Sequence, residues 1–336
     1  MAGKQNEKRH EKRHEKRKSA KSEKSEKSEK PAKQEGPEKA AKGGKAGKRS
    51  DGGGDGARPS LRELLRVTPG ERPDLRLLDS SGTPGGPAGK AAGLAATALL
   101  AQPLASLQER LYAASTAGDR RRVLLVLQGM DTSGKGGTVK HVIGQFNPSG
   151  CRIKGFKAPT EEEQSHPFLW RIKQELPLPG EIGIFDRSHY EDVLIARVRE
   201  LVPRNRVRSR YAQINRFEQA LADDGVSVVK VFLHIGHEEQ RSRLLARLDN
   251  PDKHWKFNLG DIAERSLWPA YQEAYELALE RCSTDAAPWY VVPADRKWYR
   301  NWAISTLLLE HLEDIDPHYP KGDFDVEECR RQLLEG

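Results

Sequence analysis

The residues best suited to chemistry lie in a glycine-rich segment near the middle of the chain. Residues 129–137 read GMDTSGKGG, so Gly129 through Lys135 fits the pattern G-x-x-x-x-G-K. In such a loop the glycines let backbone N–H groups surround phosphate oxygens, and the lysine supplies a mobile cation. We therefore predict that Lys135 is a catalytic cation. The predicted phosphate-binding residues are Gly129, Ser133, Gly134, Gly136, Gly137 and Thr138.

The position after the lysine departs from the usual form of this loop. It is normally Ser or Thr, whose hydroxyl holds Mg²⁺, but here it is Gly136. The nearest hydroxyl beyond it belongs to Thr138, and a carboxylate, Asp131, lies inside the loop. We therefore expect a loop carboxylate to hold the metal. The alternative is an ordinary strand–helix turn, which the register of strand, lysine and helix disfavours.

A second candidate cluster follows another apolar strand. Residues 181–194 read EIGIFDRSHYEDVL, which places Asp186 where the strand ends, with Arg187 next to it. An acid at such a strand end coordinates Mg²⁺ in nucleotide-binding folds, and an arginine can bind phosphate in bidentate fashion. We predict Asp131 and Asp186 as metal ligands and Arg187 as a catalytic cation; a helix cap with a surface arginine is the alternative. His189 is predicted to orient other groups, because phosphoryl transfer depends mainly on positioning and charge neutralisation.

A third cluster is basic and lies at about 238–260. Arg243 and Arg247 are four residues apart and share a helix face, and Lys253 and Lys256 flank Trp255. A solvated charged surface is the usual explanation of such a run. The segment follows a β-branched strand, however, and is interrupted by Pro251. We therefore predict a lid that excludes water and brings cations to the transferred group.

Composition separates the chain into a tail and a body. Residues 1–58 hold 19 of the 57 Lys and Arg and 10 of the 49 Asp and Glu, which leaves a nearly neutral body of 38 basic and 39 acidic residues. The tail repeats EKRH and SEK and contains little apolar surface, so we expect it to be disordered. The basic balance of the whole chain is therefore no sign that the body binds nucleic acid.

Strand and helix patterns alternate through the rest of the chain. We predict a helical arm over 59–122, a phosphotransferase domain over 123–320 and a C-terminal tail over 321–336. The alternation is typical of an α/β, doubly wound parallel sheet, here of five strands, which binds ligands beyond the carboxyl ends of its strands. Three widely spaced cysteines favour a reducing cytoplasm, and no segment is apolar enough to predict a membrane span. The predicted strands are 123–127, 152–156, 181–185, 226–235 and 289–292.

Four separated motifs occur in order along the chain: GMDTSGKGG, FDRSHYEDVL, DNPDKHWKFN with Trp268 and Tyr271 downstream, and APWYVVPADRKWYRN. Together they resemble the polyphosphate kinase 2 family, and the resemblance covers about 61–320. It implies a thymidylate-kinase-like P-loop fold with a helical lid, a homodimer or homotetramer, and Mg²⁺- or Mn²⁺-dependent transfer between inorganic polyphosphate and nucleoside mono- or diphosphates, namely AMP or ADP, with guanine nucleotides as further acceptors. It also implies that Lys135 binds phosphate and that Arg187 stabilises the transferring group. The SHYED run at 188–192 differs from the SWYNR form of members that act on diphosphates, which suggests that monophosphates are also accepted.

Three other functions are compatible with parts of the sequence. The first is an ATP-dependent P-loop kinase of a nucleoside or small molecule, which would use the same loop. The second is a P-loop protein guided to nucleic acid by the tail, which the nearly neutral body disfavours. The third is an inactive binding module, which the presence of Asp131, Lys135, Asp186 and Arg187 disfavours.

Overall fold

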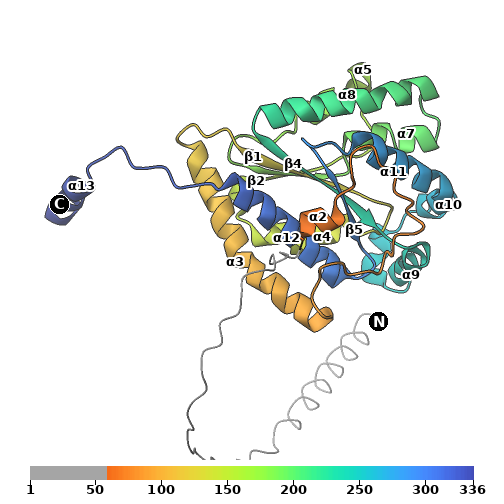
Figure 1. Ribbon diagram of the computed structural model, residues 1–336, viewed down its shortest axis with the longest axis horizontal. Coiled ribbons are helices and arrows are strands. Elements are labelled where there is room, and N and C mark those ends of the chain that lie inside the picture. Colours follow the sequence, from red (N-terminus) through yellow and green to blue (C-terminus); the bar gives the residue numbers. More distant parts are fainter. Residues whose placement is uncertain (1–58) are drawn as a thin grey trace, which may run out of the picture. The chain divides into compact units, whose positions relative to one another are not determined.

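The computed structural model describes residues 59–336; the predicted disordered tail, 1–58, lies outside the described residues. Within the described range five strands form one parallel sheet in the order β2-β3-β1-β4-β5 (Figure 1). This confirms the predicted α/β class and the five strands. The strands are β1 (Arg122–Gln128), β2 (Cys151–Gly155), β3 (Ile182–Asp186), β4 (Val226–His234) and β5 (Trp289–Pro293).

Helices cover both faces of this sheet (Figure 1). The α-helices are α2 (Leu61–Leu65), α3 (Lys90–Ser115), α4 (Lys135–His141), α5 (Glu161–Ser165), α6 (Trp170–Lys173), α7 (Ile195–Val198), α8 (Arg204–Asp223), α9 (His237–Leu248), α10 (Gly260–Ser266), α11 (Trp268–Cys282), α12 (Lys297–Ile315) and α13 (Val326–Glu335). The 3-10 helices are η1 (Ile143–Gln145), η2 (Pro148–Gly150), η3 (His189–Asp192) and η4 (Pro251–Lys256).

The central strand β1 is buried along its whole length and supplies side chains to two apolar layers. Successive side chains of a strand point to opposite faces. Leu124 and Val126 accordingly pack in the layer that α8 and α11 cover, and Val123 and Leu125 pack in the layer that α3 and α12 cover. The continuous apolar run that predicted a buried strand therefore reflects burial on both faces.

Two helical segments of the domain are each divided into two helices. The helix α5, which Thr160 and Glu163 cap as a capping box, stops before Pro167, and α6 begins beyond it. The segment 260–282 is divided at Leu267 into α10 and α11, two residues before Pro269. In both cases a proline, which has no N–H to donate and disfavours helical backbone before it, explains the break.

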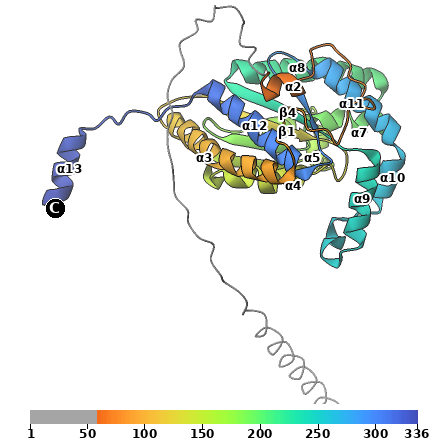
Figure 2. The ribbon, with the colours of Figure 1, turned by 60° about the horizontal axis from the view of Figure 1, so that its bottom comes forward.

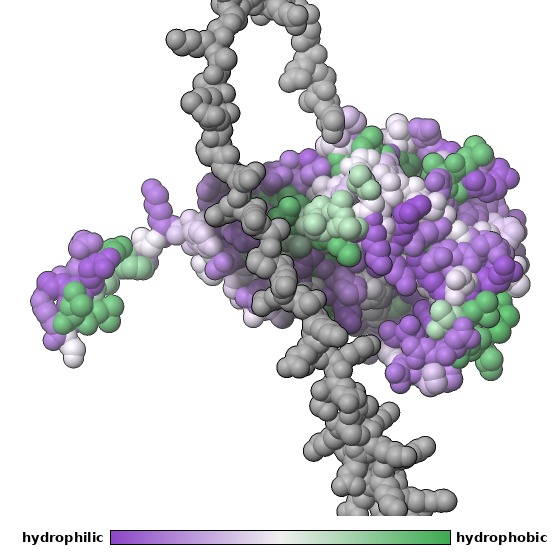
Figure 3. All heavy atoms as spheres, turned by 90° about the horizontal axis from the view of Figure 1, so that it is seen from below, coloured by the Kyte–Doolittle hydropathy of each residue, from purple (hydrophilic) through white to green (hydrophobic). Residues whose placement is uncertain are grey.

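The C-terminal segment predicted as a tail contains a helix, α13. Its N-terminus is capped by Asp325, and none of its residues is buried. Leu333 and Leu334 are exposed on it, and Figure 3 shows hydrophobic residues on one side of this segment. On the rest of that view hydrophilic residues cover most of the surface. Among the described helices, none combines the length and the apolar composition that crossing a bilayer needs.

One buried histidine joins α12 to the sheet. The ring of His311 lies 3.1 Å from Ser227 Oγ through Nδ1 and 3.0 Å from Tyr290 Oη through Nε2. Burial lowers the pKa of His311 to about 4, with a further lowering from Arg62. Because an exposed histidine has a pKa near 6.5, the folded protein resists a proton that the unfolded chain accepts.

We predict that this histidine makes the fold sensitive to acid. Between about pH 6.5 and pH 4 the unfolded state binds more protons at His311, so the free energy of unfolding falls as the pH falls, by about 3 kcal/mol in total. Urea unfolding at pH 7 and pH 5 should show a smaller pH dependence for His311→Gln than for the parent. His318→Gln, which changes an exposed histidine, is the control and should keep the parent's pH dependence. The same difference in unfolding free energy between pH 7 and pH 5 in all three proteins would contradict the prediction.

Candidate active site

The glycine-rich segment forms a loop between β1 and α4, and all the predicted phosphate-binding residues lie in it or in the first turns of α4. At Gly134 the backbone has φ = +113°, a conformation that glycine adopts without strain. A Cβ at this position would lie 1.7 Å from Nη1 of Arg300, a buried residue of α12. Glycine is therefore required here both by the turn and by the cation packed beneath it.

Lys135 begins α4 and its side chain turns back into the loop. Its Nζ donates to the carbonyl oxygens of Gly129, at 2.7 Å, and Met130, at 3.4 Å. Burial lowers the pKa of Lys135, and the carboxylate of Asp131 acts in the opposite direction. The lysine thus lies inside the loop, where a bound phosphate would meet it.

The second predicted cluster reaches the same edge of the sheet. Because β1 and β3 are parallel and adjacent, with Leu127 opposite Asp186, the two strand ends lie side by side. Arg187 follows in the left-handed conformation, with φ = +66°, and its Nη2 lies 3.2 Å from Oδ1 of Asp131. Arg187 and Asp186 both influence the pKa of Lys135. The structure therefore brings Asp131, Lys135, Asp186 and Arg187 together.

A further carboxylate, Glu191, belongs to this cluster and was assigned no role from the sequence. Burial raises the pKa of Glu191, whereas Arg187 and Lys135 lower it. With the Gln128 amide oriented to suit its neighbours, its nitrogen donates to Glu191 Oε1 at 3.1 Å. The run of acids after Asp186 was the only sequence signal for this residue, because its position depends on the turn of η3.

His189 faces away from the cluster. Its ring is fully buried, and Nε2 lies 3.1 Å from Oε1 of Glu218 on α8. Lys230 of β4 donates to the other oxygen of Glu218 at 2.5 Å and to the Tyr190 hydroxyl at 2.8 Å. This buried network holds the residues that follow Arg187, so His189 has a supporting position and no surface open to a substrate.

The lid predicted at about 238–260 corresponds to α9 and η4, and α10 follows it directly. Figure 2 shows α9 and α10 extending away from the sheet. Lys253 and Lys256 are exposed, and Lys256 Nζ lies 4.8 Å from the ring centroid of Trp255. Arg247 instead donates to the carbonyl of Lys256 at 2.9 Å and lies 3.4 Å from Asp261. Arg247 therefore joins α9 to η4 and α10, while Lys253 and Lys256 remain exposed to solvent.

Arg243 is on the lid helix α9 but contacts the phosphate loop. Its Nη1 donates to the carbonyls of Thr132, at 2.8 Å, and Ser133, at 3.1 Å. Its Nη2 donates to the carbonyls of Ala294 and Asp295, at 2.7 and 2.8 Å. One guanidinium thus joins the loop to the end of β5. Its predicted contact with the transferred group stays a prediction.

The effect on the loop follows from the geometry of the peptide group. The C=O and N–H of a trans peptide point in opposite directions. Because Arg243 holds the carbonyls of Thr132 and Ser133, the N–H groups of these two peptides point away from its guanidinium. The Ser133 N–H donates to the Met130 carbonyl at 3.1 Å, so the Gly134 N–H is the one of the two that can donate to a phosphate. Arg300 adds a second cation on the same side, with Nη1 3.5 Å from the Ser133 carbonyl. Arg300 lies in the motif APWYVVPADRKWYRN, but sequence reasoning assigned it no role, because its contact with the loop depends on the packing of α12.

The oxygen ligands at the strand ends suit a divalent metal. Asp131 and Asp186 offer hard carboxylate oxygens, and Glu191 adds a third acid nearby. Within 59–336 there is no group of three or more His, Cys, Asp or Glu side chains that could enclose a metal by itself. Two carboxylates at one edge of the sheet can hold a divalent cation together with substrate phosphates.

Comparison with known proteins identifies the family. The family model for polyphosphate kinase 2 matches residues 89–320. The chain belongs to the polyphosphate kinase 2 family. It is 49% identical to the AMP/ADP-polyphosphate phosphotransferase of Meiothermus ruber over 258 residues, which are 77% of this chain and 95% of the relative. It is 42% identical to the ADP-polyphosphate phosphotransferase of Rhodopseudomonas palustris, covering 69% and 84% of the two chains.

A solved polyphosphate kinase 2 has the same fold. The crystal structure of polyphosphate kinase 2 from Arthrobacter aurescens superposes with a TM-score of 0.80 at 48% sequence identity, covering 83% of this chain and 98% of the other. This likeness confirms the family that the four motifs suggested. The site described above therefore occurs in the fold of a polyphosphate kinase 2.

For this polyphosphate kinase 2 we predict that Arg243 acts by its forked geometry. A lysine keeps the charge but cannot reach four carbonyls at once. Arg243→Lys should therefore weaken tripolyphosphate binding about ten-fold in calorimetry, because the loop N–H groups lose their orientation. Arg241→Lys, an exposed arginine of the same helix paired with Glu238, should bind like the parent.

A comparison with Arg243→Gln separates this role from direct contact. If Arg243 met the polyphosphate as a simple cation, Arg243→Lys would bind nearly normally and only Arg243→Gln would fail. Similar losses in both variants are expected when the loss comes from the backbone geometry of the loop.

Proposed function

We propose that the chain transfers a phosphoryl group between inorganic polyphosphate and a nucleotide, with AMP and ADP as the acceptors and guanine nucleotides as further candidates. The observation that carries this proposal is the meeting of Asp131, Lys135, Asp186 and Arg187 at the adjoining ends of β1 and β3 in a member of the polyphosphate kinase 2 family. Such a cluster is suited to joining two polyanions, because it supplies cations and metal-binding carboxylates at one place.

The phosphate loop, Lys135 and Arg187 act on the polyphosphate donor. Loop N–H groups and Lys135 bind the phosphates, and Lys135 exchanges its carbonyl partners for phosphate oxygens when the donor enters. Arg187 binds the transferred phosphoryl group, since its guanidinium can make two parallel hydrogen bonds to phosphate. Arg247, Lys253 and Lys256 of the lid come closer on closure and exclude water.

Asp131 and Asp186 hold the metal, which we propose is Mg²⁺, with Mn²⁺ as a substitute of similar oxygen preference. The metal, when bound, neutralises phosphate charge and orients the reacting oxygens. Glu191 contributes negative charge next to Arg187 and favours retention of a cation.

The transfer proceeds by in-line attack of an acceptor oxygen, without a covalent enzyme intermediate. Phosphoryl transfer of this kind needs positioning and charge stabilisation more than protein nucleophiles. The buried position of His189, turned to Glu218, supports this view because it removes the histidine beside Asp186 from the reaction.

The two relatives support both acceptors: one is an AMP/ADP-polyphosphate phosphotransferase and the other an ADP-polyphosphate phosphotransferase. We further propose that the protein acts in the cytoplasm as a homodimer or homotetramer, without a specific nucleic-acid partner. The exposed apolar residues of α13 and α3, such as Leu333 and Leu99, are compatible with association between copies.

We predict that the two strand ends are needed for turnover. Lys135→Ala and Asp186→Asn should each reduce kcat/KM by at least about ten-fold while leaving the thermal unfolding curve nearly unchanged, since both side chains act on charge in the transition state. Lys140→Ala, an exposed lysine on the same helix as Lys135, is the matched control. Near-parental turnover in either site variant would remove that residue from the mechanism.

The proposed substrates are tested by pairing each donor with each acceptor. Polyphosphate or ATP is incubated with AMP, ADP, GMP or GDP, with and without metal. We expect ADP to become ATP with polyphosphate as the sole phosphate donor and the reaction to stop when the metal is chelated. Transfer from ATP to a nucleoside, with no reaction of polyphosphate, would instead establish an ATP-dependent kinase.

A further inference from the structure

A second group of cations surrounds a hollow on the face covered by α8 and α11. The hollow has a volume of about 460 Å³ and is lined by residues of α7, α8 and α11. Four of them are arginines and one is a carboxylate, so its lining is strongly positive. None of them belongs to the active site described above. The lining residues are Arg197, Arg204, Asn205, Arg208, Tyr211, Glu273, Leu277 and Arg281.

The ion pairs within the hollow leave much of this charge without a protein partner. Arg197 lies 2.8 Å from Glu273, and Arg204 lies 3.2 Å from Glu200, where both side chains are well exposed and weakly coupled. For Arg208 no ion pair occurs within the described part of the chain. The guanidinium of Arg281 lies over the ring of Tyr211, 5.2 Å from its centroid.

The start of α8 has a charge pattern that opposes its own dipole. Helix N-termini favour acidic residues, whereas α8 has no acid in its first turn and carries near its start two arginines that line the hollow, Arg204 and Arg208. Its N-cap is Pro203, which makes no side-chain cap. A bound anion would compensate the exposed N–H groups, the dipole and the arginines at once.

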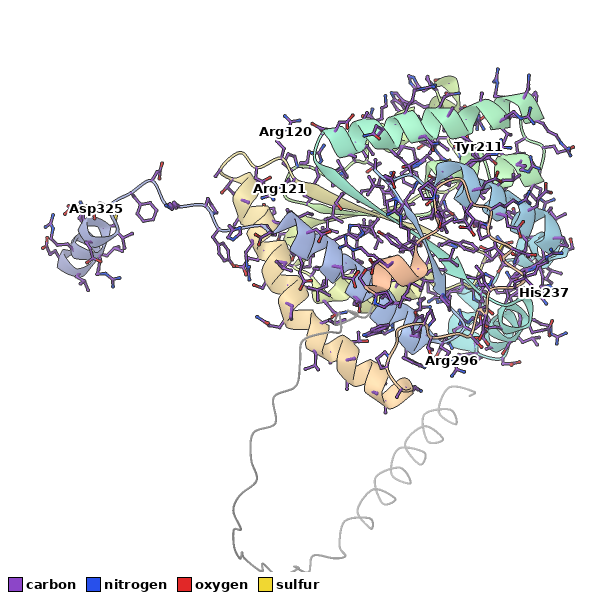
Figure 4. The ribbon with its side chains drawn as sticks, viewed as in Figure 1. Arg120, Arg121, Tyr211, His237, Arg296 and Asp325 are labelled. Atoms are coloured by element: carbon purple, nitrogen blue, oxygen red, sulfur yellow. The ribbon has the colours of Figure 1, made fainter. Side chains whose placement is uncertain are left out.

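A buried hydroxyl points to a ligand independently of the arginines. Tyr211 is 4% exposed, and its hydroxyl has no hydrogen-bond partner among residues 59–336. Burial raises the pKa of Tyr211 and Arg197 lowers it, so the hydroxyl lies within electrostatic reach of the hollow. In Figure 4 Tyr211 lies on the inner side of α8, toward α11. A buried donor of this kind usually has a partner.

The lining also indicates which anion fits. Arginine forks match phosphate oxygens, but the hollow offers no open aromatic face on which a base could stack, since the ring of Tyr211 is covered by Arg281. Leu277 is its only aliphatic lining residue. A chain of phosphates without bases therefore fits better than a nucleotide or a nucleic acid.

We propose that this arginine hollow is a second binding site for the polyphosphate chain, outside the active site. The proposal rests on the proposed function, because it takes its ligand from that reaction. A long chain that occupies the hollow and the active site together binds more tightly than either contact alone, through effective concentration. The hollow therefore gives the enzyme a preference for long polyphosphate.

The test compares two double variants of α8 with the same change of charge. Arg204→Glu with Arg208→Glu alters the hollow, and Arg206→Glu with Arg216→Glu alters exposed arginines of α8 that do not line it. KM is measured at fixed ADP for long polyphosphate and for the shortest polyphosphate that the enzyme turns over. Acidic residues favour a helix N-terminus, so thermal unfolding should confirm that the hollow variant stays folded.

We expect the hollow variant to raise KM for the long chain at least about five-fold. Its kcat and its KM for the shortest chain should stay within about two-fold of the parent, and the control pair should change KM for the long chain much less. An equal rise in both pairs, or no rise in the hollow variant, would overturn the proposal.

A binding measurement with labelled long polyphosphate keeps the two proposals apart. The hollow variant should bind the label more weakly than the parent, and RNA at equal phosphate concentration should displace little of it. Efficient displacement by RNA would overturn the choice of ligand. If the parent turned over no polyphosphate of any length, the proposed function would fail, whereas turnover of the shortest chain with unaltered long-chain binding in the variant would refute only the second site.

Discussion

The site depends on the orientation of a few peptide groups in the phosphate loop. The Gly134 N–H can face a phosphate while the Ser133 carbonyl of the same peptide is held on the other side by Arg243 and Arg300. Neither arginine needs to touch a substrate to affect its binding. Because Arg243 also holds the end of β5, the loop, the lid helix α9 and the edge of the sheet form one connected unit. Arg300 is buried, and burial lowers its pKa to about 10. A buried cation needs a compensating anion, which a phosphate bound in the loop would supply.

The part of the site that follows β3 is held in place by buried contacts. Arg187 has a left-handed backbone, which costs free energy in a residue other than glycine. The residues that follow it are fixed by the buried contacts of Glu218 and Lys230 with His189 and Tyr190. A charged network in the core contributes little net stability when it replaces apolar packing. Here the network instead fixes the position of a side chain, since it holds the guanidinium of Arg187 next to Asp131.

Much of this arrangement could be predicted from the sequence, for a definite reason. Both clusters directly follow apolar strands, and the ends of parallel strands meet at one edge, so Asp131 and Asp186 could be placed together without coordinates. The contacts of Arg243 could not, because Ser133 lies 110 residues earlier in the chain and a charged helical residue has many equivalent surroundings. The predicted domain limits and the tail at 1–58 stay predictions.

The lysine of the loop has one more consequence for selectivity. Lys135 donates to the carbonyls of Gly129 and Met130, so an anion that binds this lysine must compete with those oxygens. A single orthophosphate ion makes few other contacts to offset that competition. A multivalent chain can engage several N–H groups at the same time. Competition of this kind favours long phosphate chains over small ions by their valency.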